Sequence, residues 1–271
     1  MLLGTDWMEF AVVHTLKKGN SGMMAEAICN LIKQHGYPYK CFSLEDVLNG
    51  SQISCDILIV LGGDGTILTS IHNLEDPETP IFGISYGRGG YLAEGKPENA
   101  IECVKKILSG EYHLERHIRL EVKLNDVKIG DAINEIYISN VLPGKVIEYT
   151  IIIDNNKLAT NVGDGIIIST PLGSTAYNLS NLGPAVDDLI DCIIINPVLS
   201  LSYVPPIIIP ASRKISLLIP KIDSSLLIDG YIRRTSPDSF VEIAKSQVYT
   251  VFVRVTGESW FVQRLRKRLH W

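Results

Sequence analysis

The chain has 271 residues, 46% of them hydrophobic and 20% charged, which is enough material for one large globular domain or two modest ones. Its formal net charge of -5 argues against a nucleic-acid-binding protein, whose affinity would depend on a basic surface. The five cysteines are odd in number and scattered, without a CxxC pair. A disulfide framework or zinc site is therefore not expected, and a reducing cytoplasm is.

No segment is expected to enter a membrane. The N-terminus lacks the basic n-region of a signal peptide. The stretch from Cys192 to Ala211 is strongly apolar, but Asn196 and four prolines interrupt it. This stretch is therefore predicted to form buried strands and turns, not a membrane span.

The first part of the chain alternates short apolar strands with helices. In chain order, the predicted elements are strand Phe10–Val13, helix Ser21–Gln34 ending near Gly36, strand Asp56–Leu61, a helix from about Gly65, strand Pro80–Ile84 and helix Pro97–Leu108 closed by Gly110. Continuous apolar strands that alternate with helices predict a parallel sheet covered on both faces.

The pattern changes near residue 112, where we predict a domain boundary. The second domain, residues 113–254, is expected to be mostly β with one clear helix starting near Ser174. Its predicted strands are "LEVKLND" and "KIGDAINEIYIS" joined by a turn at Asn125–Asp126, a hairpin "EYTIIIDNNKLAT" turning at Asp154–Asn156, "DGIIISTP", "KISLLIP" and "SLLIDGYIR". The C-terminal segment, residues 255–271, has a helical pattern and is expected to pack back on the first domain, residues 1–112.

A glycine-rich loop, Gly62-Gly63-Asp64-Gly65-Thr66, follows the second predicted strand of the first domain. The carboxyl ends of parallel strands are where open α/β sheets bind ligands. Glycines let backbone amides approach an oxyanion, and the following helix N-terminus adds partial positive charge. The simpler interpretation is a tight turn in which Asp64 caps the helix. The loop matches neither the Walker A pattern nor the dinucleotide fingerprint.

Three further segments carry polar groups that suit a nucleotide. "GISYGRGGYLAE" is a second glycine-rich loop after a strand, or else a flexible connection. "GDGIIISTPLGSTAYN" ends a strand at Thr170-Pro171, and Ser174 or Thr175 is expected to cap the next helix. Its hydroxyls suit a ribose and a base, or else satisfy the local backbone. In "AINEIYIS", Asn134 and Glu135 face opposite ways on a strand, so one of them points inward or lines a site.

Taken together, these segments resemble the NAD kinase family. The resemblance covers nearly the whole chain in order: GGDGT, a glycine-rich loop ending in an aromatic residue, Asn-Glu, GDG…STPxGSTAYN, Asp229-Gly230 and a basic amphipathic C-terminal helix. It implies a Rossmann-like N-terminal α/β domain, a β-rich C-terminal domain, and homodimers or homotetramers. The GGDG loop alone is shared with diacylglycerol, sphingosine and phosphofructo-kinases.

The resemblance also implies a reaction and its residues. ATP with Mg²⁺ would phosphorylate the 2′-hydroxyl of the adenosine ribose of NAD, giving NADP, and Asp64 would be the general base. Phosphates would be held by the loop residues Gly62, Gly63, Gly65 and Thr66. The dinucleotide would contact Tyr91, Asn134, Glu135, Asp164, Thr175, Ala176 and Tyr177, with Tyr91 in place of the family's usual phenylalanine.

Some positions depart from the family pattern. Ser85-Tyr86-Gly87 replaces Asn-x-Gly, Gly89 replaces a leucine, Asn181-Leu182-Gly183-Pro184 replaces a double glycine, and "SLSYVPP" lacks the family's histidine and arginine. Two alternative functions stay open: a non-catalytic dinucleotide-binding regulatory protein, and a kinase of another hydroxyl. The sequence leaves open NAD or NADH as acceptor and ATP or polyphosphate as donor. His113 and His117 are predicted on a strand and form no metal site.

Overall fold

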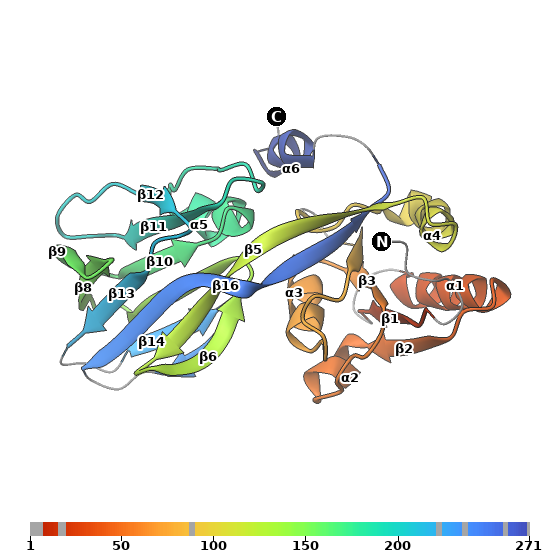
Figure 1. Ribbon diagram of the computed structural model, residues 1–271, viewed down its shortest axis with the longest axis horizontal. Coiled ribbons are helices and arrows are strands. Elements are labelled where there is room, and N and C mark those ends of the chain that lie inside the picture. The colour runs from red at the N-terminus through yellow and green to blue at the C-terminus, as the bar shows by residue number, and fades with distance from the viewer. Residues whose placement is uncertain are drawn as a thin grey trace. The chain divides into compact units, whose positions relative to one another are not determined.

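The structure is a computed structural model that describes residues 8–15, 20–86, 90–220, 224–234, 238–256 and 260–269. The chain divides into two compact units: Met1–Arg116 with Thr250–Trp271, and His117–Tyr249. Two long strands, β5 (His113–Leu124) and β16 (Ser239–Arg254), each continue from one unit into the other (Figure 1). The helix that ends the described chain, α6 (Trp260–Leu269), belongs to the first unit.

The first unit is built on a parallel sheet in the strand order β2-β1-β3-β4. Its strands are β1 (Phe10–His14), β2 (Tyr39–Ser43), β3 (Ile57–Gly62) and β4 (Ile81–Ser85). The end of β16 adds to this sheet, since Phe252 pairs in parallel with Ile81. The predicted parallel sheet is confirmed. Strand β2 escaped prediction because it lies at the sheet edge and is largely exposed, so its sequence has no apolar run.

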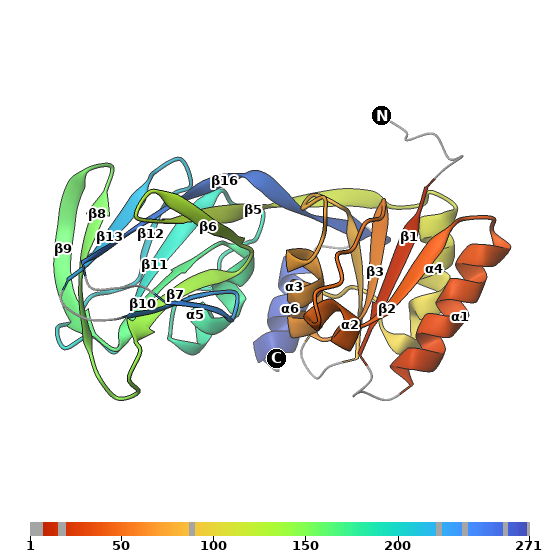
Figure 2. The same ribbon diagram turned by 90° about the horizontal axis from the view of Figure 1, so that it is seen from below.

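Helices cover both faces of this sheet. On one face, α1 (Ser21–Gln34) and α4 (Ala100–Leu108) share a hydrophobic core with β1, β3 and β4. The short α2 (Leu44–Leu48) and α3 (Asp64–His72) lie on the other face (Figure 2). The predicted helix over 97–108 starts as a 3-10 turn, η1 (Pro97–Asn99), before α4 begins. Gly36 and Gly110 have positive φ after α1 and α4, as the predicted helix ends require.

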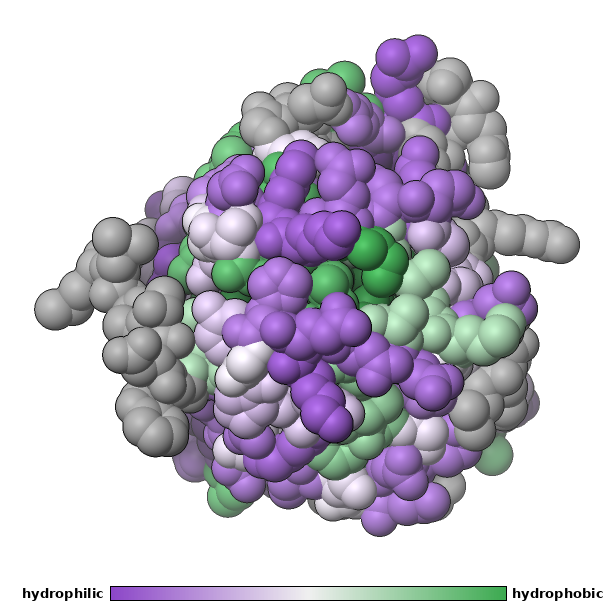
Figure 3. Space-filling view, turned by 90° about the vertical axis from the view of Figure 1, so that its right-hand side faces the viewer, coloured by the Kyte–Doolittle hydropathy of each residue, from purple (hydrophilic) through white to green (hydrophobic). Residues whose placement is uncertain are grey.

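The outer side of the first unit is mainly polar. Figure 3 views the molecule from the side where α1 and β2 lie in Figure 1, and hydrophilic side chains cover most of this face. Helix α1 exposes Glu26, Asn30 and Lys33 while it buries Ile28 and Ile32. This alternation is the amphipathic pattern of a helix with one face against a sheet.

The second unit encloses its core between two mainly antiparallel sheets. One contains β13-β8-β9 with β16, β5 and β6, and the other has the order β12-β11-β10-β7-β14-β15. Isoleucines, leucines and valines from both sheets form one buried cluster. The remaining strands are β6 (Val127–Ala132), β7 (Glu135–Asn140), β8 (Ile147–Ile153), β9 (Asn156–Gly163), β10 (Gly165–Ser169), β11 (Cys192–Val198), β12 (Ile207–Pro210), β13 (Ile215–Ile219), β14 (Ser224–Ile228) and β15 (Tyr231–Arg234).

The predicted fold class, an α/β parallel-sheet unit followed by a β-rich unit, is confirmed. In the described part of the second unit, helix is limited to η2 (Leu172–Thr175) and α5 (Tyr177–Ser180). The apolar stretch at 192–211 forms β11 and β12, as predicted. Among the described residues, no helix is long and apolar enough to span a bilayer.

The two hairpin turns were predicted from their polar residues, and the structure has them. Asn125 and Asp126 have φ of 47° and 67°, and Asp154 and Asn155 have the same two values. Asparagine and aspartate tolerate this left-handed backbone better than other residues with a side chain. By contrast, the predicted continuous strand at 128–139 divides into β6 and β7.

Candidate active site

The GGDG loop lies at the carboxyl end of β3, where the chain turns into α3. Gly63 is the N-cap of α3 in extended conformation, and Asp64 is the first helical residue. The simpler interpretation of Asp64 as the helix cap is therefore wrong: no side-chain hydrogen bond caps this helix end, and the Asp64 carboxylate binds elsewhere. An uncapped helix N-terminus at the carboxyl end of a parallel strand is a site suited to anions.

Two of the loop glycines, Gly62 and Gly65, differ in the space around them. A Cβ on Gly62 would lie 2.5 Å from Cβ of the buried Thr66, so close packing forbids a side chain there. A Cβ on Gly65 would meet nothing within 4 Å. Packing thus explains Gly62, with Thr66 as the residue against it, but it does not explain Gly65.

The Asp64 carboxylate joins the two glycine-rich loops of the first unit. Its Oδ2 accepts a hydrogen bond from the Tyr91 backbone N–H at 2.9 Å, and its Oδ1 accepts one from Leu92 at 3.0 Å. Bonds from N–H groups to a carboxylate are stronger than bonds between neutral groups. Each oxygen keeps a further lone pair, so the carboxylate can still accept a proton or a hydrogen bond.

Tyr91 is buried, and a residue far along the chain covers its ring. The Arg264 guanidinium of α6 lies 4.6 Å from the ring centroid, and its Nη1 donates to the Tyr91 carbonyl at 3.3 Å. Gly90 packs against Ser85, because a Cβ at position 90 would lie 2.5 Å from the Ser85 hydroxyl. Gly89, which stands where the family pattern has a leucine, lies outside the described residues.

In the second unit, Asp229 organises the backbone before β7. Its carboxylate accepts hydrogen bonds from the N–H groups of Ile133, Asn134 and Glu135 at 2.7, 2.8 and 3.0 Å. These N–H groups bind a carboxylate instead of a neighbouring strand, which is why the predicted strand breaks here. Asp229 itself has φ of 48° and is followed by Gly230 with φ of 87°.

The backbone of Asn134, next to β7, is hydrogen-bonded to the residues just before the GSTAY segment. Its backbone carbonyl accepts hydrogen bonds from the backbone N–H and the hydroxyl of Thr170 and from the hydroxyl of Ser169. Gly173 packs directly on it, since a Cβ there would lie 2.1 Å from the same carbonyl oxygen. The side-chain Oδ1 of Asn134 is buried and has no partner among the described residues, so it is available to a ligand.

Glu135 lines a cavity of about 290 Å³ together with Tyr137, Tyr177, Leu227 and Gly230. Burial, and to a lesser extent the Asp229 charge, raise the pKa of the Glu135 carboxyl to about 8, although a hydrogen bond from the Tyr177 backbone lowers it. Its Oε2 is buried without a partner in the described part of the chain. A carboxyl that is mostly protonated at neutral pH can donate a hydrogen bond to a ligand.

The GSTAY segment differs in detail from its prediction. Neither Ser174 nor Thr175 caps the following helix: the N-cap of α5 is Ala176, and the Ser174 hydroxyl donates to the Val186 carbonyl and accepts from the Val186 N–H. Thr175 is buried, whereas Tyr177 is 41% exposed. The ring centroids of Tyr177 and Tyr137 lie 5.1 Å apart with the ring planes nearly perpendicular, which gives the cavity an aromatic wall.

Asp164 lies between β9 and β10, flanked by two glycines in tight contact. A Cβ on Gly163 would lie 2.8 Å from the Val198 carbonyl, and one on Gly165 would lie 2.3 Å from the Ile138 carbonyl. The Asp164 charge contributes to the raised pKa of Tyr137, after burial and the nearby Tyr177. Asp164 is therefore within electrostatic range of the Tyr137 ring.

The sequence-predicted residues are divided between the two units. The first unit holds Gly62, Gly63, Asp64, Gly65, Thr66 and Tyr91, and the second holds Asn134, Glu135, Asp164, Thr175, Ala176 and Tyr177. Sequence reasoning missed Tyr137 and Arg264 and gave Asp229 no role. The Asp-Gly pair at 229–230 was a detectable turn signal. No local pattern links Arg264 to Tyr91, because 173 residues separate them.

The described residues contain no group of three or more His, Cys, Asp or Glu side chains that could hold a metal ion. His113 and His117 lie on β5, as predicted. Phosphoryl-transfer sites usually hold Mg²⁺ through one or two carboxylates and the substrate phosphates, without a dedicated protein cage. A single carboxylate beside two glycine loops, as at Asp64, fits that manner of binding.

Comparison with known proteins agrees with this architecture. The family model of the ATP-NAD kinase N-terminal domain matches residues 6–112, and that of the C-terminal domain matches residues 133–255. The NAD kinase of Pyrococcus abyssi is 32% identical over 277 residues, covering 96% of this chain and all of the relative. The NAD kinase of Methanopyrus kandleri is 30% identical, covering 93% of this chain and 94% of the relative.

Solved structures give the same result. An Archaeoglobus fulgidus NAD kinase, crystallised with ATP, aligns with a TM-score of 0.80 and 28% identity over 97% of this chain and 99% of that one. Yeast NADH kinase, crystallised with NADH, aligns with a TM-score of 0.81 over 98% and 89%, and at 21% identity it supports the fold alone. An α/β unit with a GGDG loop and a β-rich unit with a GSTAY segment thus define a class of two-unit kinases. Within that class, the chain belongs to the NAD kinase family.

Proposed function

We propose that this chain transfers the terminal phosphoryl group of ATP to the 2′-hydroxyl of the adenosine ribose of NAD, giving NADP. The observation that carries the proposal is the Asp64 carboxylate, held between two glycine-bearing loops by the amides of Tyr91 and Leu92. The named activity of relatives about 30% identical, and the ATP bound to the Archaeoglobus enzyme, support the choice of substrates.

In this proposal Asp64 acts in the chemical step. Its carboxylate takes the proton of the ribose hydroxyl as the new O–P bond forms to the terminal phosphorus of ATP. The bond from that phosphorus to the bridging oxygen breaks, and ADP leaves with the electron pair. Amides at Gly62, Gly63 and Gly65 hold phosphate oxygens, and Thr66 keeps Gly62 in place.

The second unit supplies the dinucleotide contacts in this proposal. The unpartnered Oδ1 of Asn134 accepts a hydrogen bond from the adenine side, and the protonated Glu135 donates one in the same cavity. The exposed ring of Tyr177, next to Thr175 and Ala176, packs on the base. Asp164 binds the nicotinamide amide or ribose, and Tyr91 lies beside a ring of the dinucleotide.

Mg²⁺ would enter this site with ATP. When bound, the ion would neutralise the charge that develops on the phosphate oxygens. Asp64 is the carboxylate of the glycine loops that would face it. Backbone amides of the same loops would bind the phosphates directly.

An assay of the purified full chain tests the proposal. With ATP, Mg²⁺ and NAD, NADP should form and be detected by an NADP-specific dehydrogenase. NAD that lacks the adenosine 2′-hydroxyl is the matched control and should give no phosphorylated product. Phosphorylation of that analogue would point to another hydroxyl, and binding of NAD without turnover would favour a regulatory dinucleotide-binding protein.

We also propose that the chain self-associates as a homodimer or homotetramer. Four large apolar side chains in the segment from Leu182 to Tyr203 of the second unit are exposed, and we call them the exposed apolar run. They are Leu182 (92%), Leu199 (71%), Leu201 (76%) and Tyr203 (90%). Large apolar side chains exposed to this extent support a role in contact with another protein surface. A second copy is the partner with which an isologous interface forms without any other component.

A further inference from the structure

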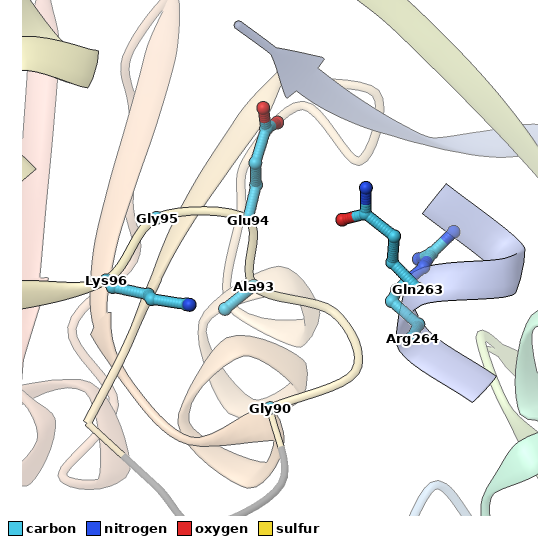
Figure 4. Close-up of a pocket in the computed structure, with 7 residues that line it drawn as sticks. All are labelled: Gly90, Ala93, Glu94, Gly95, Lys96, Gln263 and Arg264. Atoms are coloured by element: carbon cyan, nitrogen blue, oxygen red, sulfur yellow. The ribbon is translucent and has the colours of Figure 1, made fainter. Parts of the chain in front are cut away.

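Helix α6 faces the second glycine-rich loop within the first unit. A cavity of about 290 Å³ lies between residues 90–96 and two side chains of the helix, Gln263 and Arg264. Figure 4 shows the loop on one side of this cavity and α6 on the other, with the Gln263 amide directed toward the loop. The helix therefore lies beside the loop whose amides hold Asp64.

Arg264 of α6 contacts Tyr91 of the second glycine-rich loop. It is only 3% exposed, although the neighbouring helix surface carries exposed arginines such as Arg266. A guanidinium taken from water needs partners, and the Tyr91 ring at 4.6 Å and the Tyr91 carbonyl at 3.3 Å are two of them. The side chain is thus held in one place, and it holds Tyr91 from the face and from the carbonyl.

The other end of the same peptide segment holds Asp64. The N–H of Tyr91 donates to one carboxylate oxygen and the N–H of Leu92 to the other. A shift of Tyr91 would therefore change the direction of both bonds. Through Tyr91, Arg264 of α6 is two contacts away from the Asp64 carboxylate.

A second set of hydrogen bonds holds the chain just before α6 against the same loop. The buried Glu94 carboxylate accepts hydrogen bonds from the N–H groups of Val255 (3.1 Å) and Thr256 (2.9 Å), where β16 has ended. Burial raises the pKa of Glu94, and the Arg254 charge opposes the rise. Arg254 is itself buried and donates to Glu115 at 2.8 Å.

We propose that Arg264 is a positioning residue for the phosphoryl-transfer site, which fixes Tyr91 and, through its backbone, the direction of the Asp64 carboxylate. The proposal rests on the catalytic role proposed above for Asp64. Arg264 touches no reacting atom. Its planar guanidinium stacks on a ring and donates to a carbonyl at the same time, which a lysine ammonium does not reproduce.

Hydrogen exchange of the Tyr91 and Leu92 amides tests this role without using the reaction. In the full chain, Arg264→Ala should raise the exchange rate of both amides by about tenfold or more, because the loop loses its cover and its carbonyl partner. Arg266→Ala is the matched control on the exposed side of the same helix and should leave both rates unchanged. Equal rates in wild type and Arg264→Ala overturn the proposal, whether or not the chain phosphorylates NAD.

Kinetics gives a second readout. In Arg264→Ala, kcat should fall by about 10- to 100-fold with a smaller change in KM for NAD, because a small displacement of a catalytic group affects the chemical step. Arg264→Lys keeps the charge and the stem, so it tests the role if the alanine variant fails to fold, and its kcat should also fall. Normal kcat and normal amide exchange in a folded Arg264→Lys protein would overturn the proposal. Failure of the proposed function is seen separately, as absence of NADP formation by the wild type.

Discussion

Gly62 and Gly65 lie in one loop, yet the structure gives a packing reason for only one of them. Gly62→Ala would place a Cβ 2.5 Å from Cβ of Thr66 and should destabilise the fold by about 1–3 kcal/mol.

Gly65→Ala meets open space in a helix and should leave the free energy of unfolding unchanged or raise it by about 0.5–1 kcal/mol. If that space takes a phosphate, KM for ATP should nevertheless rise about tenfold. Urea unfolding and steady-state kinetics separate the effects, and unaltered kinetics would remove Gly65 from the binding site.

Asp64→Asn tests the proposed base, with a complication that the structure reveals. Asparagine offers one oxygen where the amides of Tyr91 and Leu92 need two, so the variant loses one loop bond as well as the proton acceptor. We expect kcat to fall by about 10²–10⁴-fold. Asp46→Asn is the control, since Asp46 also accepts a backbone N–H, at the start of α2. It should lower stability and leave kcat unchanged, and near-normal turnover by folded Asp64→Asn would contradict the catalytic role.

Glu135 should make stability depend on pH. Its folded-state pKa is about 8 against 4.5 for the ordinary carboxyl, so the folded chain binds a proton that the unfolded chain has lost. The stability that comes from the protonated Glu135 carboxyl is fully present below pH 4.5 and is lost as the pH rises through 8. Glu135→Gln cannot titrate, so its unfolding free energy relative to wild type should grow over this range, by about 3–5 kcal/mol in total.

Urea unfolding of both proteins without nucleotide, at intervals from pH 5 to pH 9, measures this difference. Glu148→Gln, at an exposed position of β8, serves as the control substitution in the same unit. A difference between Glu135→Gln and wild type that stays constant over the series would show that the carboxyl is not buried as described.

At the scale of elements, the turn after α5 carries a strained residue. Leu182 has φ of 58°, in the left-handed region that costs a residue with a side chain about 1–2 kcal/mol, and it stands where the family pattern has a glycine. Leu182→Gly removes this strain, while glycine adds about 0.5–1 kcal/mol of entropic cost. The variant should be more stable by about 0.5–1 kcal/mol in urea unfolding at matched protein concentration. Leu201→Gly, in the same apolar run, should bring no such gain.

Elements with strong local signals could be predicted, and those defined by distant partners could not. The apolar runs gave β1, β3 and β4, and the Asn-Asp and Asp-Asn pairs gave both hairpin turns. The edge strand β2 lacks an apolar run. The break between β6 and β7 depends on the Asp229 carboxylate, about 95 residues away, which takes up the N–H groups of 133–135. Strand β16 escaped prediction although it contributes to both units.

For the molecule as a whole, the order of motifs predicted the family, but the contacts between motifs needed the structure. Asp64 could be selected from the sequence because a carboxylate within a glycine loop is unusual. Its attachment to the second loop spans 27 and 28 residues, and the contact of Arg264 with that loop spans 173. Such contacts arise from chain topology, because residues 250–271 return to the first unit, and no local periodicity encodes that return.

Self-association is the prediction that concerns the whole molecule. If the exposed run between Leu182 and Tyr203 is covered by a second copy, a charge placed there must be desolvated on association and should disrupt it. Leu201→Asp should therefore lower the mass measured by sedimentation equilibrium toward that of one chain, while its circular dichroism stays native.

Leu142→Asp is the matched control, because Leu142 is also an exposed leucine of the second unit, at 61%, but lies outside this run. Its mass should equal that of the wild type. A wild-type chain that sediments as a monomer at micromolar concentration would contradict self-association. If Leu142→Asp, and not Leu201→Asp, dissociated the assembly, the interface would lie on the side of the β7–β8 connection. Because association couples to folding by mass action, the dissociated variant should also lose the concentration dependence of Tm that the wild type shows.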